Sequence, residues 1–142
     1  MRRKPDDITI LFACVHNAGR SQMAAALFNQ LADPARAHAI SAGTRPAVRV
    51  HPEVADGLRE IGIEIAGQTP RRLTPELAAG ARWLVTMGCG DECPIVPGAV
   101  REDWPLEDPR GLPPERVRAI RDEIQRRVRE LIAAQGWARA PR

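Results

Sequence analysis

The 142-residue sequence is poor in aromatic residues, with three tryptophans, two phenylalanines and no tyrosine. Proteins that bind RNA or single-stranded DNA stack bases on exposed aromatic side chains, so this scarcity argues against such a function. The net charge of +3 is too small to indicate nucleic-acid binding by itself, although it suits a small anionic substrate or an acidic partner. We therefore expect no nucleic-acid partner.

Long hydrophobic runs are also missing, and no segment approaches the roughly 20 residues that a transmembrane helix needs. A basic start, Arg2 to Lys4, precedes an apolar stretch that covers only Ile8 to Val15, without the cleavage pattern of a secretory signal. We therefore expect a cytoplasmic protein without a membrane partner. In that compartment, three cysteines indicate reactive thiols rather than structural disulfides.

The sequence has no internal repeat and no low-complexity segment, and its length fits one domain. We expect a single domain over residues 1–142, with a core over about 8–134 and flexible ends at 1–7 and 136–142. Short, mostly apolar runs predict strands at 8–15, 38–41, 82–87 and 99–104. Apolar residues at helical spacing predict helices at 21–31, with Ser21 as its cap, from Pro52 to Gly62, at 75–79 and from near Pro113 onward. The arginines on the other face of the last helix are expected to face solvent.

Strands that alternate with helices in this way predict an α/β fold with parallel strands. Parallel sheets bind their ligands at the carboxyl ends of the strands. Four polar or reactive segments follow the predicted strands, and we expect them to meet at that edge of the sheet. They are Cys14, Ser41 to Thr44, Cys89, and Asp103 to Asp108.

The first segment continues from Cys14 through Arg20 to Ser21. If the chain turns tightly there and enters a helix, its backbone N–H groups and the helix N-terminus form a site for an anion, which also favours the Cys14 thiolate. Gly19 allows backbone angles that a side chain would forbid, and Arg20 can bind two oxygens of a tetrahedral oxyanion. We therefore predict Cys14 as a nucleophile, and we leave open whether His16 contacts the substrate or points to solvent. The predicted oxyanion-binding loop consists of Val15, His16, Asn17, Ala18, Gly19, Arg20 and Ser21.

This loop, followed by Gln22-Met23-Ala24, resembles the low-molecular-weight protein tyrosine phosphatase superfamily, and it looks most like the arsenate reductase branch. The resemblance covers about residues 8–134 and implies a three-layer sandwich, in which a four-stranded parallel sheet has helices on both faces. It extends to Ser41-Ala42-Gly43-Thr44, to Val85-Thr86-Met87-Gly88-Cys89, and to Glu102-Asp103-Trp104 with Asp108-Pro109.

A thiolate that attacks phosphorus or arsenic needs a general acid to protonate the leaving oxygen. Asp103, Glu107 and Asp108 are the candidates near the expected edge of the sheet. Pro109 favours an extended backbone at Asp108, and the resemblance implies that this Asp-Pro pair supplies the acid. We therefore predict Asp108, with a purely turn-forming Asp-Pro as the alternative.

Cys89 and Cys93 distinguish a reductase from a phosphatase, because arsenate reduction takes two electrons from thiols whereas a phosphatase needs one cysteine. Cys89 follows a predicted neighbouring strand, so it can reach Cys14. We expect Cys89 to release arsenite from a Cys14–arsenic adduct as a Cys14–Cys89 disulfide forms, and Cys93 to convert that bond to Cys89–Cys93. A metal half-site and inert packing residues remain the alternative interpretations of these two cysteines.

These inferences predict an arsenate reductase with Cys14, Arg20, Asp108, Cys89 and Cys93 as its catalytic residues. A low-molecular-weight protein tyrosine phosphatase and a non-catalytic oxyanion or arsenic sensor are the alternatives. We expect arsenate as the substrate, phosphate or sulfate as other occupants of the loop, no metal, no tightly bound cofactor, and a monomer. Electrons are expected from a thioredoxin-like protein, or from a low-molecular-weight thiol with a glutaredoxin-like protein. Related proteins bind potassium with a helix glutamate, and since Ala25 is the matching residue here, potassium is not expected.

Overall fold

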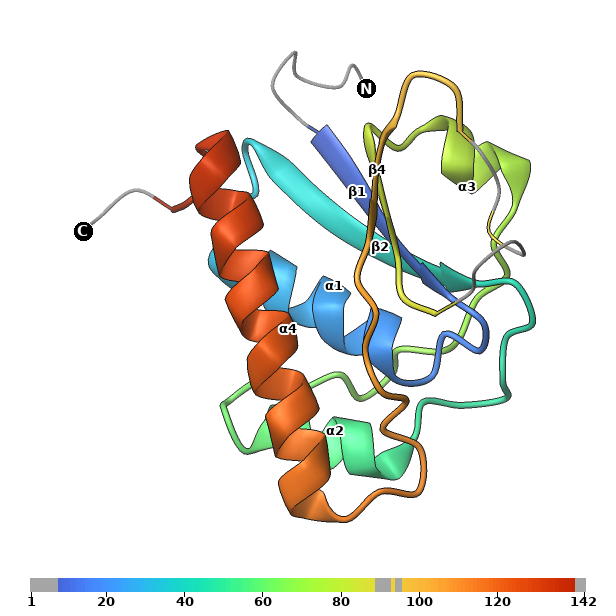
Figure 1. Cartoon of the computed structure of the whole chain (residues 1–142), viewed down its shortest axis with the longest axis vertical. Coiled ribbons are helices and arrows are strands. Elements are labelled where there is room, and N and C mark those ends of the chain that lie inside the picture. The colour runs from blue at the N-terminus through green and yellow to red at the C-terminus, as the bar shows by residue number, and fades with distance from the viewer. Residues whose placement is uncertain (1–7, 89–92, 94–95, 140–142) are drawn as a thin grey trace.

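The computed structural model describes residues 8–88, 93 and 96–139 (Figure 1). Every predicted strand and helix is present, with ends that differ from the predicted ones by a few residues. In chain order the elements are β1 (Ile8–Cys14), α1 (Arg20–Leu31), β2 (Ala37–Gly43), α2 (Pro52–Arg59), α3 (Pro75–Ala79), β3 (Trp83–Thr86), β4 (Val100–Asp103) and α4 (Pro114–Gln135).

The four strands form one parallel sheet in the order β2-β1-β3-β4. β1 lies between β2 and β3, and six of its seven residues are buried, which explains its nearly continuous apolar sequence. The register places Cys14 opposite Gly43, and Thr86 opposite both Ala13 and Asp103. The carboxyl ends of the four strands therefore meet at one edge, which confirms the predicted parallel α/β fold.

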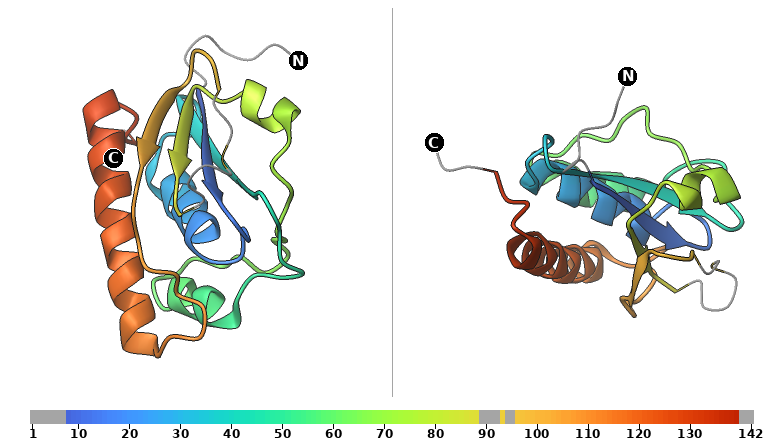
Figure 2. Two further views of the ribbon diagram at one scale, coloured as in Figure 1. Left: turned by 45° about the vertical axis from the view of Figure 1, so that its right-hand side comes forward. Right: turned by 90° about the horizontal axis from the view of Figure 1, so that it is seen from above.

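Alternate residues of β1 point into two cores of unequal size, as the pleat of a strand requires. Ile10 and Phe12 belong to the larger core, which α1, α2 and α4 cover. Leu11 and Ala13 belong to a smaller core on the opposite face, which α3 covers (Figure 2). Helices on both faces of the sheet confirm the three-layer architecture. Within the described part of the chain, no helix has the length and hydrophobicity that a membrane crossing requires.

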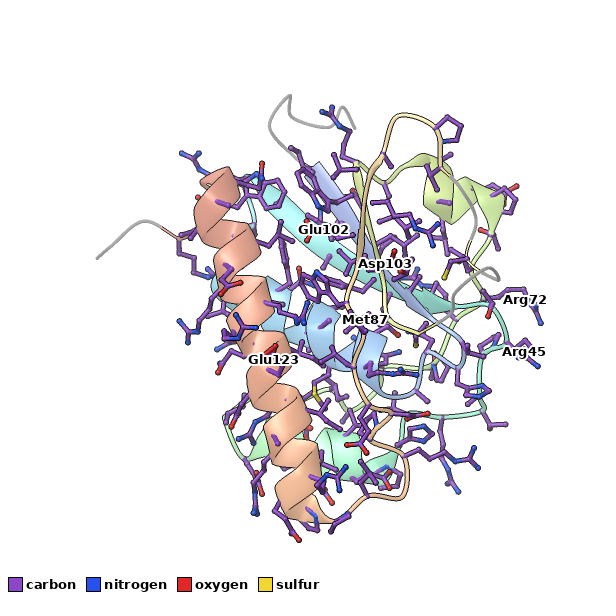
Figure 3. All side chains as sticks on the ribbon, in the orientation of Figure 1. Arg45, Arg72, Met87, Glu102, Asp103 and Glu123 are labelled. Carbon is purple, nitrogen blue, oxygen red and sulfur yellow. The ribbon has the colours of Figure 1, made fainter. Side chains whose placement is uncertain are left out.

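All five aromatic residues of the chain lie together between the sheet and α4. Ring centroids are 5.5 to 6.1 Å apart in the pairs Phe12–Phe28, Phe12–Trp104, Phe28–Trp137 and Trp83–Trp137. The carboxylate of Glu102, labelled in Figure 3, accepts hydrogen bonds from both Trp83 Nε1 at 2.7 Å and Trp104 Nε1 at 3.2 Å. The scarce aromatic residues therefore pack in or against the core. The indole N–H groups of Trp83 and Trp104 have a hydrogen-bond partner there, as tryptophans in a core require.

The predicted flexible end at 136–142 is wrong for its first residues. Gly136 ends α4 in the left-handed conformation, with φ 75°, and turns the chain back towards α1. Trp137 is only 6% exposed, and its carbonyl accepts a hydrogen bond from Asp33 N at 2.8 Å. Ala138 forms an isolated bridge with Ala32. A buried indole thus fixes a segment that its small and basic neighbours made look frayed, while residues 1–7 and 140–142 lie outside the described residues.

The arginines of α4 were expected to face solvent, but Arg121 does not. This side chain is buried and donates from Nη1 to Gly57 O at 2.8 Å and to Glu60 Oε1 at 2.9 Å. Arg118 binds both oxygens of the same carboxylate from the exposed side, at 2.8 to 3.1 Å. Glu60 therefore connects the end of α2 to α4.

This connection predicts a pH-dependent part of the stability. Hydrogen bonds from Arg118 first, and then from Arg121, lower the pKa of Glu60 to about 2. A lowered folded-state pKa stabilises the fold fully above the unfolded value of about 4.5, and the contribution disappears as the pH falls towards 2. In urea unfolding, the difference between wild type and Glu60→Gln should therefore be full at pH 6 and vanish near pH 2.

A Glu123→Gln variant provides the comparison for that measurement. The pKa of Glu123 is also lowered to about 2, but by Arg126 and Arg127 of its own helix. Glu123, Arg126 and Arg127 already lie on one helix. Loss of the Glu123 carboxylate should therefore lower the free energy of unfolding at pH 6 less than loss of the Glu60 carboxylate does. Equal effects of the two variants would contradict the role of Glu60 as a connection between helices.

Candidate active site

The segment between β1 and α1 forms a tight loop around the side chain of Cys14. β1 ends at Cys14 and α1 begins at Arg20, with Gly19 as its N-cap residue. The left-handed backbone angle of the loop is at Asn17, with φ 49°. Ser21 was expected to cap the helix, but it lies inside the first turn, is buried, and directs its hydroxyl to the cysteine instead.

Two groups of the loop contact the sulfur of Cys14, which is a free thiol and 3% exposed. Asn17 N donates to Sγ at 3.2 Å, and Ser21 Oγ lies 2.8 Å from Sγ. The Ser21 oxygen accepts from Asn17 Nδ2 at 2.8 Å, so its own proton is available to the sulfur. Two donors directed at one sulfur stabilise the thiolate, which is the nucleophilic form of cysteine.

Residues 44–51, which we call the strap, run beside the loop and bind its carbonyl groups. Thr44 N donates to Cys14 O, Arg45 N to Val15 O, Ala47 N to His16 O and His51 N to Ala18 O, at 2.8 to 3.1 Å. The described peptide bonds are all trans, so a carbonyl that faces the strap turns the following N–H group to the opposite side. Asn17 N, which points to the sulfur, shows this arrangement directly. The N–H groups that follow these carbonyls thus face away from the strap, and that of Asn17 is directed at Cys14, as an anion site requires.

Arg20 lies at the start of α1, and its side chain reaches the segment that follows β4. Its Nη1 donates to Leu106 O at 2.9 Å, and its Nη2 lies 3.9 Å from Asp108 Oδ2. The side chain is 13% exposed, so one face of the guanidinium is accessible while the protein fixes the rest. The structure thus brings the predicted oxyanion-binding arginine and the predicted acid together.

The other two carboxylates that were considered as acids have different partners. Asp103 accepts a hydrogen bond from Thr86 Oγ1 and pairs with Arg101. Glu107 pairs with Arg116 of α4. Asp108 is 44% exposed and lies beside Arg20 instead.

A hydrogen bond from its own turn orients Asp108. Arg110 N donates to Asp108 Oδ1 at 3.0 Å. The turn is anchored further by Glu53 of α2, which accepts from Gly111 N at 3.1 Å. Of the three candidate acids, Asp108 is therefore the one that lies beside Arg20, and its own turn orients it.

Of the two further cysteines, Cys93 lies within the described residues. Cys93 is 5% exposed and belongs to the smaller core with Leu11, Ala13 and Leu84 of the sheet. Cys89 lies outside the described residues, so its predicted approach to Cys14 stays a prediction. In the described ranges, no three His, Cys, Asp or Glu side chains lie close enough to hold a metal ion.

Sequence reasoning missed several contacts that shape the loop. The ring of His16 is bound to Arg45 O at 3.1 Å and is thereby held against the strap. Gln22, one residue beyond the predicted loop, binds the loop from behind, together with the backbone of Arg71. A glutamine in the first turn of α1, directly before the apolar run from Met23 to Phe28, was the available signal for this contact.

Gly88 follows β3 and lies against the guanidinium of Arg20. Its φ is 95°, and a Cβ at this position would lie 2.5 Å from Arg20 Nη1. We therefore expect Gly88→Ala to displace Arg20 and to lower the affinity for phosphate roughly 10- to 100-fold, the range for a lost hydrogen bond to a charged group. Isothermal titration calorimetry measures this affinity.

Gly98→Ala is the matched control, because Gly98 has a similar φ of 84° but, apart from its chain neighbours, none of the described residues has an atom within 4 Å of the place that a Cβ would occupy. Both variants carry the backbone strain of a left-handed alanine, about 1–2 kcal/mol, but one alone disturbs Arg20. An unchanged phosphate affinity in Gly88→Ala would contradict this expectation, because a Cβ at residue 88 would then not disturb the binding of phosphate by Arg20.

A thiol within an N–H-lined loop, followed by an arginine at the helix start, defines a class of α/β proteins that bind tetrahedral oxyanions for cysteine-based chemistry. The chain belongs to the family described as low molecular weight phosphotyrosine protein phosphatase, whose sequence pattern matches residues 9–137.

Relatives and solved structures with arsenate reductase names resemble the chain over most of its length. A protein of Synechocystis, named glutaredoxin arsenate reductase, is 35% identical over 127 residues, which cover 87% of this chain and 95% of that protein. The solved structure of a thioredoxin-dependent arsenate reductase from Corynebacterium glutamicum is 38% identical with a TM-score of 0.79, and the match covers 92% of this chain and 62% of that chain. An arsenate reductase from Archaeoglobus fulgidus is 33% identical with a TM-score of 0.73, over 87% of this chain and 98% of that chain.

Proposed function

We propose that this chain reduces arsenate to arsenite, with Cys14 as the nucleophile and thiols as the source of electrons. The observation that supports this most strongly is the free, buried Cys14 thiol inside an N–H-lined loop, with Arg20 and Asp108 beside each other at the same edge of the sheet. The full-length similarity to arsenate reductases selects this activity among those that such a loop allows.

The first step forms a sulfur–arsenic bond. Arsenate occupies the loop, where backbone N–H groups and the Arg20 guanidinium bind its oxygens. The Cys14 thiolate attacks arsenic, and one arsenic–oxygen bond breaks. Asp108 donates a proton to the departing oxygen, which leaves as water. The contact of Arg20 with Leu106 O and its proximity to Asp108 support a common position of these groups around the substrate.

The second step transfers two electrons to arsenic. In the reduced enzyme, the thiolate of Cys89 attacks Cys14 Sγ, the sulfur–arsenic bond breaks, and its electron pair stays on arsenic as arsenite leaves. A Cys14–Cys89 disulfide remains. The thiolate of Cys93 then attacks Cys89, which frees Cys14 and leaves a Cys89–Cys93 disulfide. Burial of Cys93 in the small core beside β1 and β3 supports a position near the site.

An external dithiol restores the enzyme by reducing that last disulfide. We propose a thioredoxin-like protein for this role, because the relay ends in a disulfide between two cysteines close in sequence. The name of the Corynebacterium relative supports this choice, whereas the name of the Synechocystis relative points to glutaredoxin. In a glutaredoxin-linked enzyme, a small thiol such as glutathione would instead attack the Cys14 adduct.

The test compares three reactions of the purified protein. Arsenate turnover is followed as NADPH oxidation with thioredoxin and its reductase, and separately with glutathione, glutaredoxin and glutathione reductase. Hydrolysis of an aryl phosphate such as p-nitrophenyl phosphate is the third reaction. We expect arsenate turnover to exceed ester hydrolysis, and we expect thioredoxin to support it.

Two outcomes would overturn parts of this proposal. If ester hydrolysis proceeds while neither donor supports arsenate turnover, the chain is a phosphatase. If peptide mapping after one turnover finds no Cys89–Cys93 bridge, the relay is wrong even when arsenite is formed, and the glutaredoxin route is favoured.

A further inference from the structure

Asn17 connects the backbone of the loop to the sulfur of Cys14. Its N–H group donates to Cys14 Sγ at 3.2 Å, and its side chain donates to Ser21 Oγ, which in turn lies 2.8 Å from the sulfur. Among the residues that the structure describes, it is the one non-glycine residue with a positive φ, 49°. Such a conformation costs free energy and persists only where surrounding contacts impose it.

Gln22 supplies contacts that impose this conformation. Its Nε2 lies 3.2 Å from Asn17 O and 3.2 Å from Asn17 Oδ1, and 3.4 Å from Thr69 O. One amide group thus binds the main chain and the side chain of Asn17 at once. Gln22 is 5% exposed, so water does not readily replace its N–H groups.

The segment after α2 completes the arrangement from the other side. Arg71 N donates to Asn17 Oδ1 at 2.9 Å, and Arg71 Nε donates to Ser41 O at 3.4 Å. The segment at residues 69–71 is therefore bound to the loop directly through Arg71 and through Gln22, which contacts Thr69 O. We call Gln22, Thr69 and Arg71 together the rear clamp.

We propose that Gln22 is a positioning residue: through the rear clamp it fixes Asn17 in its left-handed conformation and thereby sets the two hydrogen bonds that stabilise the Cys14 thiolate. The Nε2 group of Gln22 donates to Asn17 and Thr69 and not to the sulfur, so Gln22 acts on Cys14 through Asn17. Its significance for arsenate reduction rests on the proposed function, whereas its effect on the thiol does not.

A packing role alone does not account for Gln22. The side chain lines a pocket of about 400 Å³ in which polar residues such as Ser41 and Arg71 lie beside apolar ones such as Ile63 and Ile65, so these surroundings do not by themselves select a glutamine. A methionine at this position keeps the length of glutamine but donates no hydrogen bond. Gln22→Met would therefore remove the hydrogen bond from Gln22 Nε2 to Asn17 O. Asn17 Oδ1 would lose the bond from Gln22 and keep the one from Arg71 N.

The experiment measures the thiol itself. The alkylation rate of Cys14 by iodoacetamide is followed from pH 4 to pH 9 by peptide mass spectrometry, in wild type, Gln22→Met and Gln22→Glu. Gln22→Glu places an acceptor carboxylate against Asn17 O and Oδ1, so it provides an independent disruption if Gln22→Met fails to fold. Gln68→Met is the matched control, because Gln68 lines the same pocket. Circular dichroism establishes that each variant is folded.

We expect the alkylation profile to move to higher pH in both Gln22 variants, because the donors to the sulfur are displaced, and to stay unchanged in Gln68→Met. Arsenate kcat should fall about tenfold in Gln22→Met, as for one lost hydrogen bond near the upper end of its usual contribution. A wild-type profile in a folded Gln22→Met variant would overturn the proposal. If the profile shifts while the wild type does not reduce arsenate, the positioning role stands and the proposed function fails.

Discussion

Replacement of Cys14 by serine should abolish arsenate reduction while the fold is retained. The substitution exchanges sulfur for a smaller oxygen that can still accept from Asn17 N and bond to Ser21 Oγ, so the buried hydrogen-bond network survives. The hydroxyl is not ionised near neutral pH and cannot take part in a disulfide, so both the attack on arsenic and the electron transfer are lost. We expect no arsenite above the rate without enzyme.

Cys93→Ser is the control for this result. A variant that lacks the last thiol of the relay can still form the Cys14 adduct and release one arsenite as the first disulfide forms. Single-turnover analysis by arsenic speciation should therefore find about one arsenite per enzyme in Cys93→Ser and none in Cys14→Ser. Arsenite release from Cys14→Ser would exclude Cys14 as the nucleophile.

The second large effect is expected for Asp108→Asn. The amide keeps the size of the side chain and can still accept the hydrogen bond from Arg110 N, so the turn should remain intact. It has no acidic proton for the departing oxygen, and general acid catalysis contributes about 10²- to 10⁴-fold to such reactions. We expect kcat for arsenate to fall by that factor while phosphate still binds to the loop.

Glu107→Gln tests whether the position of the carboxylate matters. Glu107 is the neighbouring residue, but it pairs with Arg116 rather than lying beside Arg20. Its amide variant should keep kcat within about threefold of wild type, as expected for a change at an exposed ion pair. Equal losses in the two variants would mean that charge near the site, rather than a proton from Asp108, accounts for the effect.

The parts of the fold that depend on hydrophobic periodicity could be predicted from the sequence. β1 is buried on both faces and therefore mostly apolar, and α4 repeats its apolar residues at helical spacing. The meeting of Cys14, Arg20 and Asp108 also follows from sequence, since parallel strands place their carboxyl ends together.

Contacts that depend on the backbone or on single long-range partners could not be predicted. The strap binds the loop through N–H groups that every residue except proline possesses, so its sequence gives no sign of its role. Trp137 was assigned to a flexible end because no periodic pattern continues past Gly136, whereas its burial depends on Phe28 and Trp83, which are distant in sequence. Arg121 likewise is an arginine of a charged helix in sequence, and its burial depends on Gly57 in α2 and Glu60 at the end of α2, which are distant in sequence.

The strap holds the loop through its backbone, which leaves its side chains free to differ. Its bonds to the loop skip residue 46, where a proline without an N–H group stands between Arg45 and Ala47. The side chains of Arg45, Val48 and Arg49 are exposed, with Val48 at 95%, and Arg45 lies at the edge of the molecule in Figure 3. Charge and shape on this side of the loop can thus vary one residue at a time, while the same backbone amides hold the loop around Cys14.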